Sequence, residues 1–476
     1  MNKATYESPL CSRYASNEMQ YLFSPDMRYH TWRKLWVALA KAENKLGLNI
    51  TKEQIAELEE GIEKIDYEAI AIKEKETRHD VMAHVYGYGL NCPNAKGIIH
   101  LGATSCYVTD NADVVIYRDA LKLVLQKLLT VISNLSDFAD KYKDLPTLGY
   151  THYQPAQLVT VGKRASLWLQ DFMLDLEEID FVISTVRMLG SKGTTGTQAS
   201  FLKLFDGNHE KVKQLDGLIA KEFNMENCYH VSGQTYPRKA DSRILNVLSA
   251  IAQSAYRFAD DMRLLQHMRE VEEPFEKGQI GSSAMAYKRN PMRCERICSL
   301  SRYIITNSQN AAMTASTQWL ERTLDDSANR RIALPEGFLA TDAVLNLLIN
   351  VTENLVVYPK VIEKNIREFL PFIATENLLM AAVKMGGDRQ EMHEIIRKHS
   401  MDAAAAMKLE GVPCDLLTRL ASDKNFILDE AQLNDALNPM DYIGRAPQQV
   451  SEYINDCVKP TLASHNYHHI SATIDV

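Results

Sequence analysis

The stretch ATSCYVTDNADVVIYRDALKLVLQKLLTVISNLSDFADKYKDL, residues 103–145, decides the fold. It contains neither glycine nor proline, and its apolar positions recur at helical spacing, as in Leu121, Leu125, Leu128 and Ile132. The pattern predicts one long helix. If only about 30 of these residues are helical, the helix spans roughly 45 Å, so helices of similar length must lie beside it.

Four further segments lack both glycine and proline and carry the same periodicity: 163–189, 238–273, 292–334 and 338–358. No series of alternating strands is present. We therefore expect an all-α fold, built on an elongated central bundle of long helices. Helices that are apolar on more than one side favour packing between subunits, which predicts a homo-oligomer.

Shorter helices are expected on either side of this bundle. Ser24-Pro25-Asp26 begins a helix that ends near Gly47, and Thr51 to Gln54 form a capping box for a helix that ends near Gly61. After Pro359 the helices shorten again, with a capping box at 388–391 and a stop at Gly411. We expect three helical domains, at 1–105, 106–358 and 359–476.

Composition restricts the classes of function. The 476 residues are 46% hydrophobic and 24% charged, and the net charge of -8 argues against general nucleic-acid binding. The N-terminus lacks the apolar core of a signal peptide, and no uninterrupted apolar run reaches membrane-spanning length, which predicts a cytoplasmic protein without membrane contact. Eight scattered cysteines form no Cys-x-x-Cys pair, so neither a zinc site nor a disulfide framework is indicated.

Residues 281–291, GSSAMAYKRNP, place two serines beside dense positive charge at a predicted helix start. Lys288, Arg289, Arg293 and Arg296 are opposed locally only by Glu295. This repulsion at the positive end of a helix dipole indicates an anion site, although a solvated basic turn is an equal alternative.

Three other polar segments lie where long helices are expected to begin or end. Residues 102–106 offer hydroxyls at a helix start, either for an anion or for simple N-capping by Thr104 or Ser105. Residues 150–155 place His152, which can exchange protons near neutral pH, in a short polar loop. Residues 321–331 hold arginines that bind anions or form surface ion pairs.

Two further segments are less specific. Residues 77–84 contain His79 and His84, but their spacing does not match a zinc protease motif, and His84 is expected in the core. Residues 190–198, rich in glycine and threonine, are either a mobile lid or a surface connection. No phosphate-binding loop, serine elbow or dinucleotide fingerprint is present, so a cofactor-free and metal-free acid–base reaction fits best.

Residues 102–111, 151–157, 192–200 and 281–291 together resemble the signature regions of the fumarase/aspartase superfamily. Within it, residues 77–84, 232–239 and 322–331 resemble the eukaryotic type of the adenylosuccinate lyase family, over nearly the whole chain. The resemblance implies the three-domain superfamily fold and a homotetramer whose active sites each draw on three chains. It also implies release of fumarate from adenylosuccinate, giving AMP, and from the succinylated aminoimidazole carboxamide ribotide.

By this resemblance Ser282 is the general base and His152 the general acid, while Lys288 stabilises the ionised serine and the intermediate. Ser283 is chemically identical to Ser282, and only the family pattern chooses between them. The resemblance also implies contacts to the purine nucleotide substrate at Arg13, Tyr14, Arg78, His79, Asp80, Thr104, Ser105, Gln234, Lys288, Asn290, Arg296, Arg322, Ser327 and Arg331. One departure from the pattern is Ala286, where proline is usual.

Three alternatives remain open. Another fumarate-releasing member of the superfamily, such as argininosuccinate lyase or fumarase, would share the bundle and the base. A structural homologue without catalysis, or a nucleotide-binding regulator without turnover, would share the fold. The presence of both Ser282 and His152 argues against a silent homologue.

Overall fold

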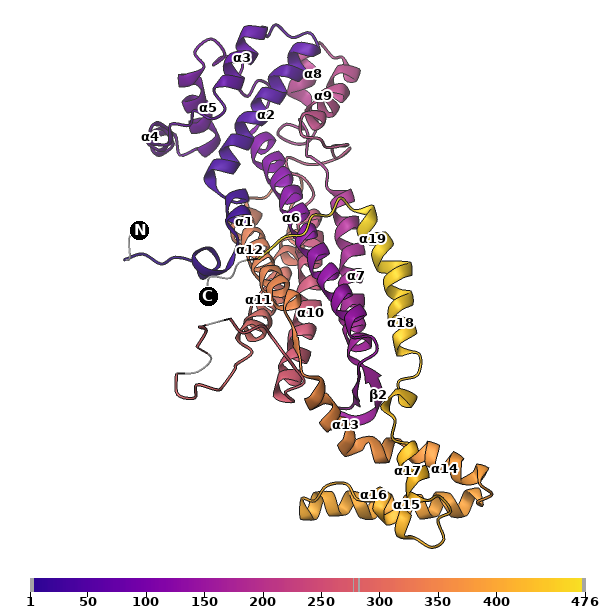
Figure 1. Cartoon of the computed structure of the whole chain (residues 1–476). Coiled ribbons are helices and arrows are strands. Elements are labelled where there is room, and N and C mark those ends of the chain that lie inside the picture. The colour runs from indigo at the N-terminus through magenta and orange to yellow at the C-terminus, as the bar shows by residue number, and fades with distance from the viewer. Residues whose placement is uncertain (1–3, 277, 281–282, 473–476) are drawn as a thin grey trace.

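Five long helices run side by side and form the body of the molecule (Figure 1). The computed structural model describes residues 4–276, 278–280 and 283–472. The bundle consists of α6 (Ser105–Lys141), α7 (Val161–Thr185), α10 (Lys239–His267), α11 (Met292–Ser316) and α12 (Asp325–Glu353). Their apolar faces meet in one buried cluster, in which Leu128, Phe172, Phe258 and Leu348 have no exposed surface. The predicted all-α bundle is confirmed.

The boundary between the last two long helices differs from the prediction. The sequence was expected to give one helix over 292–334 and another after Gly337, but the chain breaks at 317–324 and α12 continues through Pro335 and Gly337. Proline costs an interior helix about 3 kcal/mol, which burial of the surrounding apolar surface offsets. At Gly337 a Cβ would lie 2.7 Å from Leu245 Cδ2, so the glycine allows α12 to approach α10. Among the described residues α12 alone is long and apolar enough to span a membrane, and 78% of its most apolar window is buried.

The N-terminal part of the chain packs on one end of the bundle (Figure 1). It contains α2 (Pro25–Lys45), α3 (Lys52–Glu60), α4 (Tyr67–Thr77) and α5 (Asp80–Asn91), after the short α1 (Asn17–Leu22). The predicted caps are present: Ser24 caps α2, and Thr51 with Gln54 forms the capping box of α3. The later helices α8 (Ala199–Leu204) and α9 (His209–Glu222) share its apolar core through Phe201 and Leu215.

At the opposite end lie α13 (Pro359–Ile373), α14 (Thr375–Lys384), α15 (Arg389–Glu410), α16 (Leu416–Ser422) and α17 (Glu430–Asp435) (Figure 1). Gly411 ends α15 in the left-handed conformation, as expected. The chain then returns along the bundle through α18 (Ala446–Tyr453) and α19 (Lys459–Ser464), and Val450 and Val458 join the core of the bundle. Segments distant in sequence therefore share cores, and the domain boundaries at 105 and 358 stay predictions.

Two short antiparallel sheets complete the fold. Strands β1 (Pro146–Thr151) and β2 (Gln154–Thr160) form a hairpin beyond the C-terminal end of α6, where the sequence had indicated only a loop. Its two-residue turn consists of His152 and Tyr153, both at positive φ (54° and 56°), the geometry of a type I′ turn. The second sheet pairs β3 (Val271–Glu272) with β4 (Val356–Val357).

A glycine sets how closely two of the long helices approach. In the first turn of α7, a Cβ on Gly162 would lie 2.2 Å from the carbonyl oxygen of Ala139 and 2.6 Å from the backbone nitrogen of Lys143. We expect Gly162→Ala to lower the free energy of unfolding by about 1–3 kcal/mol, because backbone atoms at the end of α6 would have to move. Urea unfolding at fixed protein concentration measures this.

The matched control is Gly217→Ala in the interior of α9, where a Cβ would meet nothing within 4 Å. This change should stabilise the chain by up to about 1 kcal/mol, since alanine favours the helix. Equal unfolding free energies for Gly162→Ala and the unaltered chain would contradict the close approach of α6 and α7.

Candidate active site

A cavity of about 400 Å³ lies where α6 and α12 begin, next to the start of α5 and the segment before α10. Seven of the residues expected to contact substrate line it, although they come from four separate stretches of the sequence. They are His79, Asp80, Ser105, Gln234, Arg322, Ser327 and Arg331. The structure therefore brings together half of the predicted contact set in one place.

The side-chain hydroxyls at the start of α6 do not cap the helix. Thr104 is the N-cap residue, but its side chain accepts no hydrogen bond from the helix backbone. Ser105 Oγ instead lies 3.3 Å from Nε2 of His79, which is itself the N-cap of α5. The alternative of simple N-capping is wrong for Thr104, and the positive end of a 37-residue helix faces the cavity with its hydroxyls.

The neighbouring residues of this segment divide into exposed and buried positions. Arg78 ends α4 in the left-handed conformation (φ 52°), is exposed, and is not part of the cavity wall. His84 is buried and stacks on Tyr29 with ring centroids 3.9 Å apart, and burial lowers its pKa to about 4. The expectation that His84 belongs to the core is confirmed.

A buried ionic network forms the floor of the cavity. Arg238 donates to Asp326 (2.6 Å) and to Asp110 (2.9 Å), and its side chain is 2% exposed. Arg330 donates to Asp241 (2.6 Å), again with both partners buried. The network therefore joins the N-terminal ends of α10 and α12 to Asp110, in the second turn of α6, through side chains that are at most 8% exposed.

Tyr236 lies between the two arginines of this network. The guanidinium carbons of Arg238 and Arg330 lie 4.5 and 5.3 Å from the centre of its ring, and its hydroxyl donates to Asp241 and accepts from Arg330. The ring separates two like charges while each keeps its own carboxylate. The network thus fixes the cavity wall through Tyr236, Arg238 and Arg330, and leaves other lining residues available to a ligand.

The arginines of residues 321–331 therefore have different roles. Arg322 pairs with the buried Asp326 at 3.0 Å and reaches the cavity. Arg331 is exposed, and its pair with Asp80 is long, at 3.9 Å. Arg330 is structural. The alternative of weak surface pairs is wrong for Arg330 and holds best for Arg331, which is free to turn toward a bound anion.

Sequence reasoning missed the members of this network. They are Asp110, Asp113, Tyr236, Arg238, Asp241, Asp326 and Arg330. A signal was present: Asp110 and Asp113 are charged residues at i, i+3 on one face of an otherwise apolar long helix, where an unpaired carboxylate would be costly. The sequence did not identify their partners.

A second group of predicted residues surrounds another cavity, of about 710 Å³, lined by Arg13, Tyr14 and Arg296. The Arg296 guanidinium lies 5.5 Å from the centre of the Tyr14 ring. A buried pair fixes this N-terminal segment: Asp342 accepts from the backbone N–H of Ser16 (2.7 Å) and pairs with Lys127.

The third group lies at the far end of the bundle. His152 is exposed at the tip of the β1–β2 hairpin. Ser282, the expected base, lies outside the described residues, while Ser283 and Lys288 are exposed and Asn290 is half-buried beside the start of α11. In this chain alone, therefore, neither His152 nor Lys288 lines the cavity that holds the first group.

Part of the positive charge around 288–296, that of Arg289 and Arg293, is balanced by acids from earlier in the chain, so the expectation that only Glu295 opposes it is wrong. The Glu273 carboxylate accepts from the backbone N–H groups of Arg293 (3.1 Å) and Cys294 (2.9 Å), so it caps α11. Arg293 also pairs with Glu276 at 2.5 Å, and Arg289 with Glu272 at 3.3 Å. These acids precede the basic run by about twenty residues, so the local count of charges overlooked them.

The Gly/Thr-rich segment is anchored at its first half. Asp216 accepts from the backbone N–H (2.7 Å) and hydroxyl (2.6 Å) of Ser191, pairs with Lys192, and accepts from Gln198 at 3.3 Å. Gln234 of the cavity donates to the carbonyl of Thr194 at 3.2 Å. The segment is thus attached to the cavity wall, and its exposed part is limited to residues around 194–197.

Comparison with known proteins identifies the family. The lyase family signature matches residues 13–306, and the signature described as the adenylosuccinate lyase C-terminus matches residues 371–453. A protein named adenylosuccinate lyase from Schizosaccharomyces pombe is 54% identical to this chain, over 96% of this chain and 96% of its own length. A protein of the same name from Saccharomyces cerevisiae is 52% identical, over 96% of this chain and 95% of its own length. The chain belongs to the adenylosuccinate lyase family.

Solved structures agree on the fold of this adenylosuccinate lyase family member. A fumarate lyase from Mesorhizobium sp. aligns with a TM-score of 0.79 at 23% identity, covering 94% of this chain and 99% of its own. A 3-carboxy-cis,cis-muconate lactonizing enzyme from Pseudomonas putida aligns with a TM-score of 0.82 at 22% identity, covering 95% and 99%. At this identity the likeness concerns the fold alone.

The buried network predicts a large loss of stability when one charge is removed. Arg238→Met should lower the free energy of unfolding by about 3–5 kcal/mol, because Asp110 and Asp326 would remain buried without their main partner. Chemical denaturation measures the change.

The control is Arg257→Met on the same helix, whose pair with Asp171 is exposed and contributes at most about 1 kcal/mol. If both substitutions cost the same, the ionic network does not hold the cavity floor.

Proposed function

We propose that this chain cleaves adenylosuccinate to AMP and fumarate, and the succinylated aminoimidazole carboxamide ribotide to its carboxamide and fumarate. The observation that carries the proposal is the convergence of seven expected contact residues on one cavity in a chain of this family. Such a reaction requires cations and hydroxyls for phosphate and carboxylate groups, together with a base and an acid.

The chemistry is an elimination. A base removes a proton from the carbon beside a carboxylate, the electron pair forms the double bond of fumarate, and the carbon–nitrogen bond breaks. The leaving nitrogen takes a proton from an acid. We assign the base to Ser282 and the acid to His152, with Lys288 stabilising negative charge on the serine and on the intermediate. These assignments rest on the family pattern.

The contact residues supply complementary charge. The start of α6, with Thr104 and Ser105, suits an anionic group together with His79 at the start of α5, because free backbone N–H groups and hydroxyls meet there. Arg322 and Arg331 suit a second anionic group through their planar forks. Arg78, Asp80, Gln234 and Ser327 complete this contact set, and Arg13, Tyr14, Asn290 and Arg296 belong to the other two groups.

One chain does not bring all three groups together. Ser105 begins α6 and the hairpin with His152 follows its far end, and a helix of 37 residues spans roughly 55 Å. The acid must therefore reach this cavity from another copy of the chain. We propose a homotetramer in which three chains contribute to each site.

An exposed apolar stripe on the bundle supports association between copies. Leu167, Leu174 and Phe181 follow each other at intervals of seven on α7 and are 41%, 53% and 56% exposed. Residues spaced by seven lie on one face of a helix, which is the pattern of helix-to-helix packing. An isolated chain would leave this face in water.

The competing functions are argininosuccinate lyase, fumarase and a homologue without catalysis. The relatives named above carry the name adenylosuccinate lyase, which favours the proposed reaction over the first two. The cytoplasmic location expected from the sequence remains part of the proposal.

The purified protein should release fumarate from adenylosuccinate and not from argininosuccinate. Ser282→Ala and His152→Ala should each lower kcat by about 10²–10⁴-fold, since each removes a proton-transfer group. Ser283→Ala is the matched control and should retain most of the activity. Loss of turnover in Ser283→Ala with activity intact in Ser282→Ala would assign the base to Ser283 instead.

Mixing two inactive variants tests the shared site. When Ser282→Ala and His152→Ala proteins are dissociated and reassembled together, fumarate release should return to a measurable fraction of the original rate, because some sites then receive both intact residues from different chains. Reassembly of either variant alone is the control. Mixed assemblies that stay as inactive as the separate variants would argue that one chain supplies both residues.

A further inference from the structure

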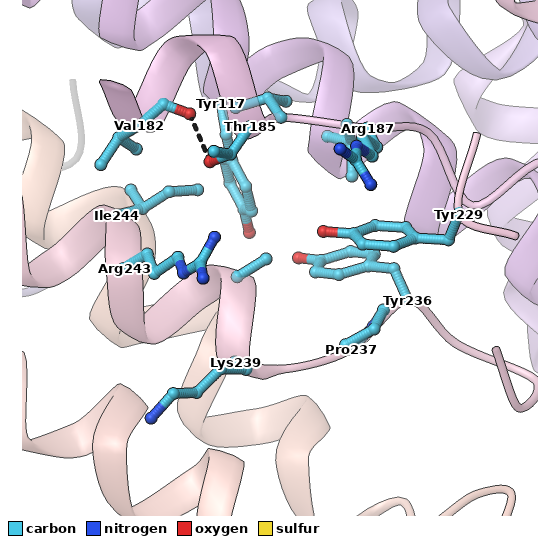
Figure 2. Close-up of a pocket in the computed structure, with 13 residues that line it drawn as sticks. Tyr117, Val182, Thr185, Arg187, Tyr229, Tyr236, Pro237, Lys239, Arg243 and Ile244 are labelled. Carbon is cyan, nitrogen blue, oxygen red and sulfur yellow. Dashed lines mark hydrogen bonds between the residues drawn. The ribbon is translucent and has the colours of Figure 1, made fainter. Parts of the chain in front are cut away.

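A third cavity, of about 210 Å³, adjoins the buried network at Tyr236. It is enclosed by the end of α7, the start of α10 and one face of α6 (Figure 2). Tyr117 and the network residue Tyr236 form part of its wall, and Tyr117 also lines the candidate active site. The two cavities therefore share a wall but are distinct.

Most of the wall is apolar or aromatic. Val114, Val182, Val186 and Ile244 supply aliphatic surface, and three tyrosines supply ring surface. Figure 2 shows the Tyr117, Tyr229 and Tyr236 hydroxyls directed toward one central space. A flat ring fits such a lining, because it contacts both aliphatic and aromatic groups.

Three cations surround the same cavity without a carboxylate partner. Arg187, Lys239 and Arg243 all line it, and within residues 4–276, 278–280 and 283–472 none of the three forms an ion pair or a side-chain hydrogen bond. Asp241, two residues after Lys239, is already occupied by Arg330 and Tyr236. Figure 2 shows Arg187 on one side of the cavity and Arg243 on the other, so positive charge borders the space from two sides and favours an anion inside it.

Tyr117 gives an independent indication. Its side chain is 5% exposed, its ring stacks on Phe338 with centroids 6.0 Å apart, and its hydroxyl has no hydrogen-bond partner among the described residues. In Figure 2 this hydroxyl points into the cavity. The hydroxyl is therefore available to donate a hydrogen bond to a group inside the cavity.

We propose that this cavity binds a small organic anion in which a flat ring carries a phosphate. The ring lies against the tyrosines and aliphatic side chains, and the Arg187 and Arg243 guanidinium groups hold the phosphate, with Lys239 adding charge at the mouth. A phosphate monoester carries nearly two negative charges at neutral pH, which matches this group of cations better than a single carboxylate does. The inference does not depend on the proposed reaction.

Equilibrium dialysis with labelled AMP tests the site, because AMP combines a flat ring with a phosphate. The chain should bind one more AMP per chain than the double variant Arg187→Ala/Arg243→Ala, or bind it at least tenfold more tightly at this site. Tyr117→Phe, which removes only the hydroxyl, should weaken binding severalfold. Adenosine and inorganic phosphate, each carrying half of the ligand, should bind more weakly than AMP.

The matched control is Arg257→Ala, an exposed arginine on the same helix, which should bind as much AMP as the unaltered chain. Both arginines of the double variant are exposed, so its unfolding transition should be unchanged, which excludes loss of folding as the cause. Equal AMP binding in the double variant and the unaltered chain would overturn the proposal, as would an equal loss in Arg257→Ala. Since dialysis requires no turnover, failure here is distinguishable from failure to release fumarate.

Discussion

The pairing of Arg238 and Arg330 with four aspartates is the interaction on which the rest of the molecule depends. Apolar contacts alone would align the long helices only loosely along their axes, because leucine-rich faces tolerate a shift better than charges do. Buried guanidinium groups do not tolerate such a shift, because moving one helix along another would leave an almost fully buried charge without its partner. The network therefore fixes where α6, α10 and α12 begin relative to each other, and these three starts are the walls of the candidate active site.

That constraint also explains why one chain does not bring the proposed acid, His152, to the candidate active site. The same long helices that position the first group of residues place the His152 hairpin a full helix length away. A rigid bundle of this length does not bend to bring its ends together. Packing of bundles from neighbouring chains would bring the two ends together instead. In the proposed function the exposed apolar stripe on α7 is then a contact surface between chains.

The fold was predictable from the sequence where local physics decides it. Long intervals without glycine or proline identified the bundle, and side-chain caps identified the starts of α2 and α3. Prediction failed where distant residues decide. Pro335 and Gly337 stay inside α12 because the helix is buried against α10, and Glu273 caps α11 from about twenty residues upstream. The partners of Arg238 lie 88 and 128 residues away, so no local pattern identifies them. His152 and Tyr153 form a type I′ turn without the Asn-Gly signal that usually marks it.

A second buried ion pair joins α6 to α12 and adds to the constraint that the network imposes on these helices. Lys127 of α6 pairs with Asp342 of α12, and both residues lie sixteen or more positions further along these helices than Asp110 and Asp326 of the network. Asp342 also accepts a hydrogen bond from the backbone N–H of Ser16. Two charged contacts at different heights fix both the axial register and the rotation of one helix against the other, which a single contact does not. We infer that specificity of register is what these costly pairs provide. Because Arg13 and Tyr14 are attached through Ser16 while Arg322 and Ser327 are attached through the start of α12, the spacing between two groups of expected contact residues is fixed before any ligand or neighbouring chain arrives.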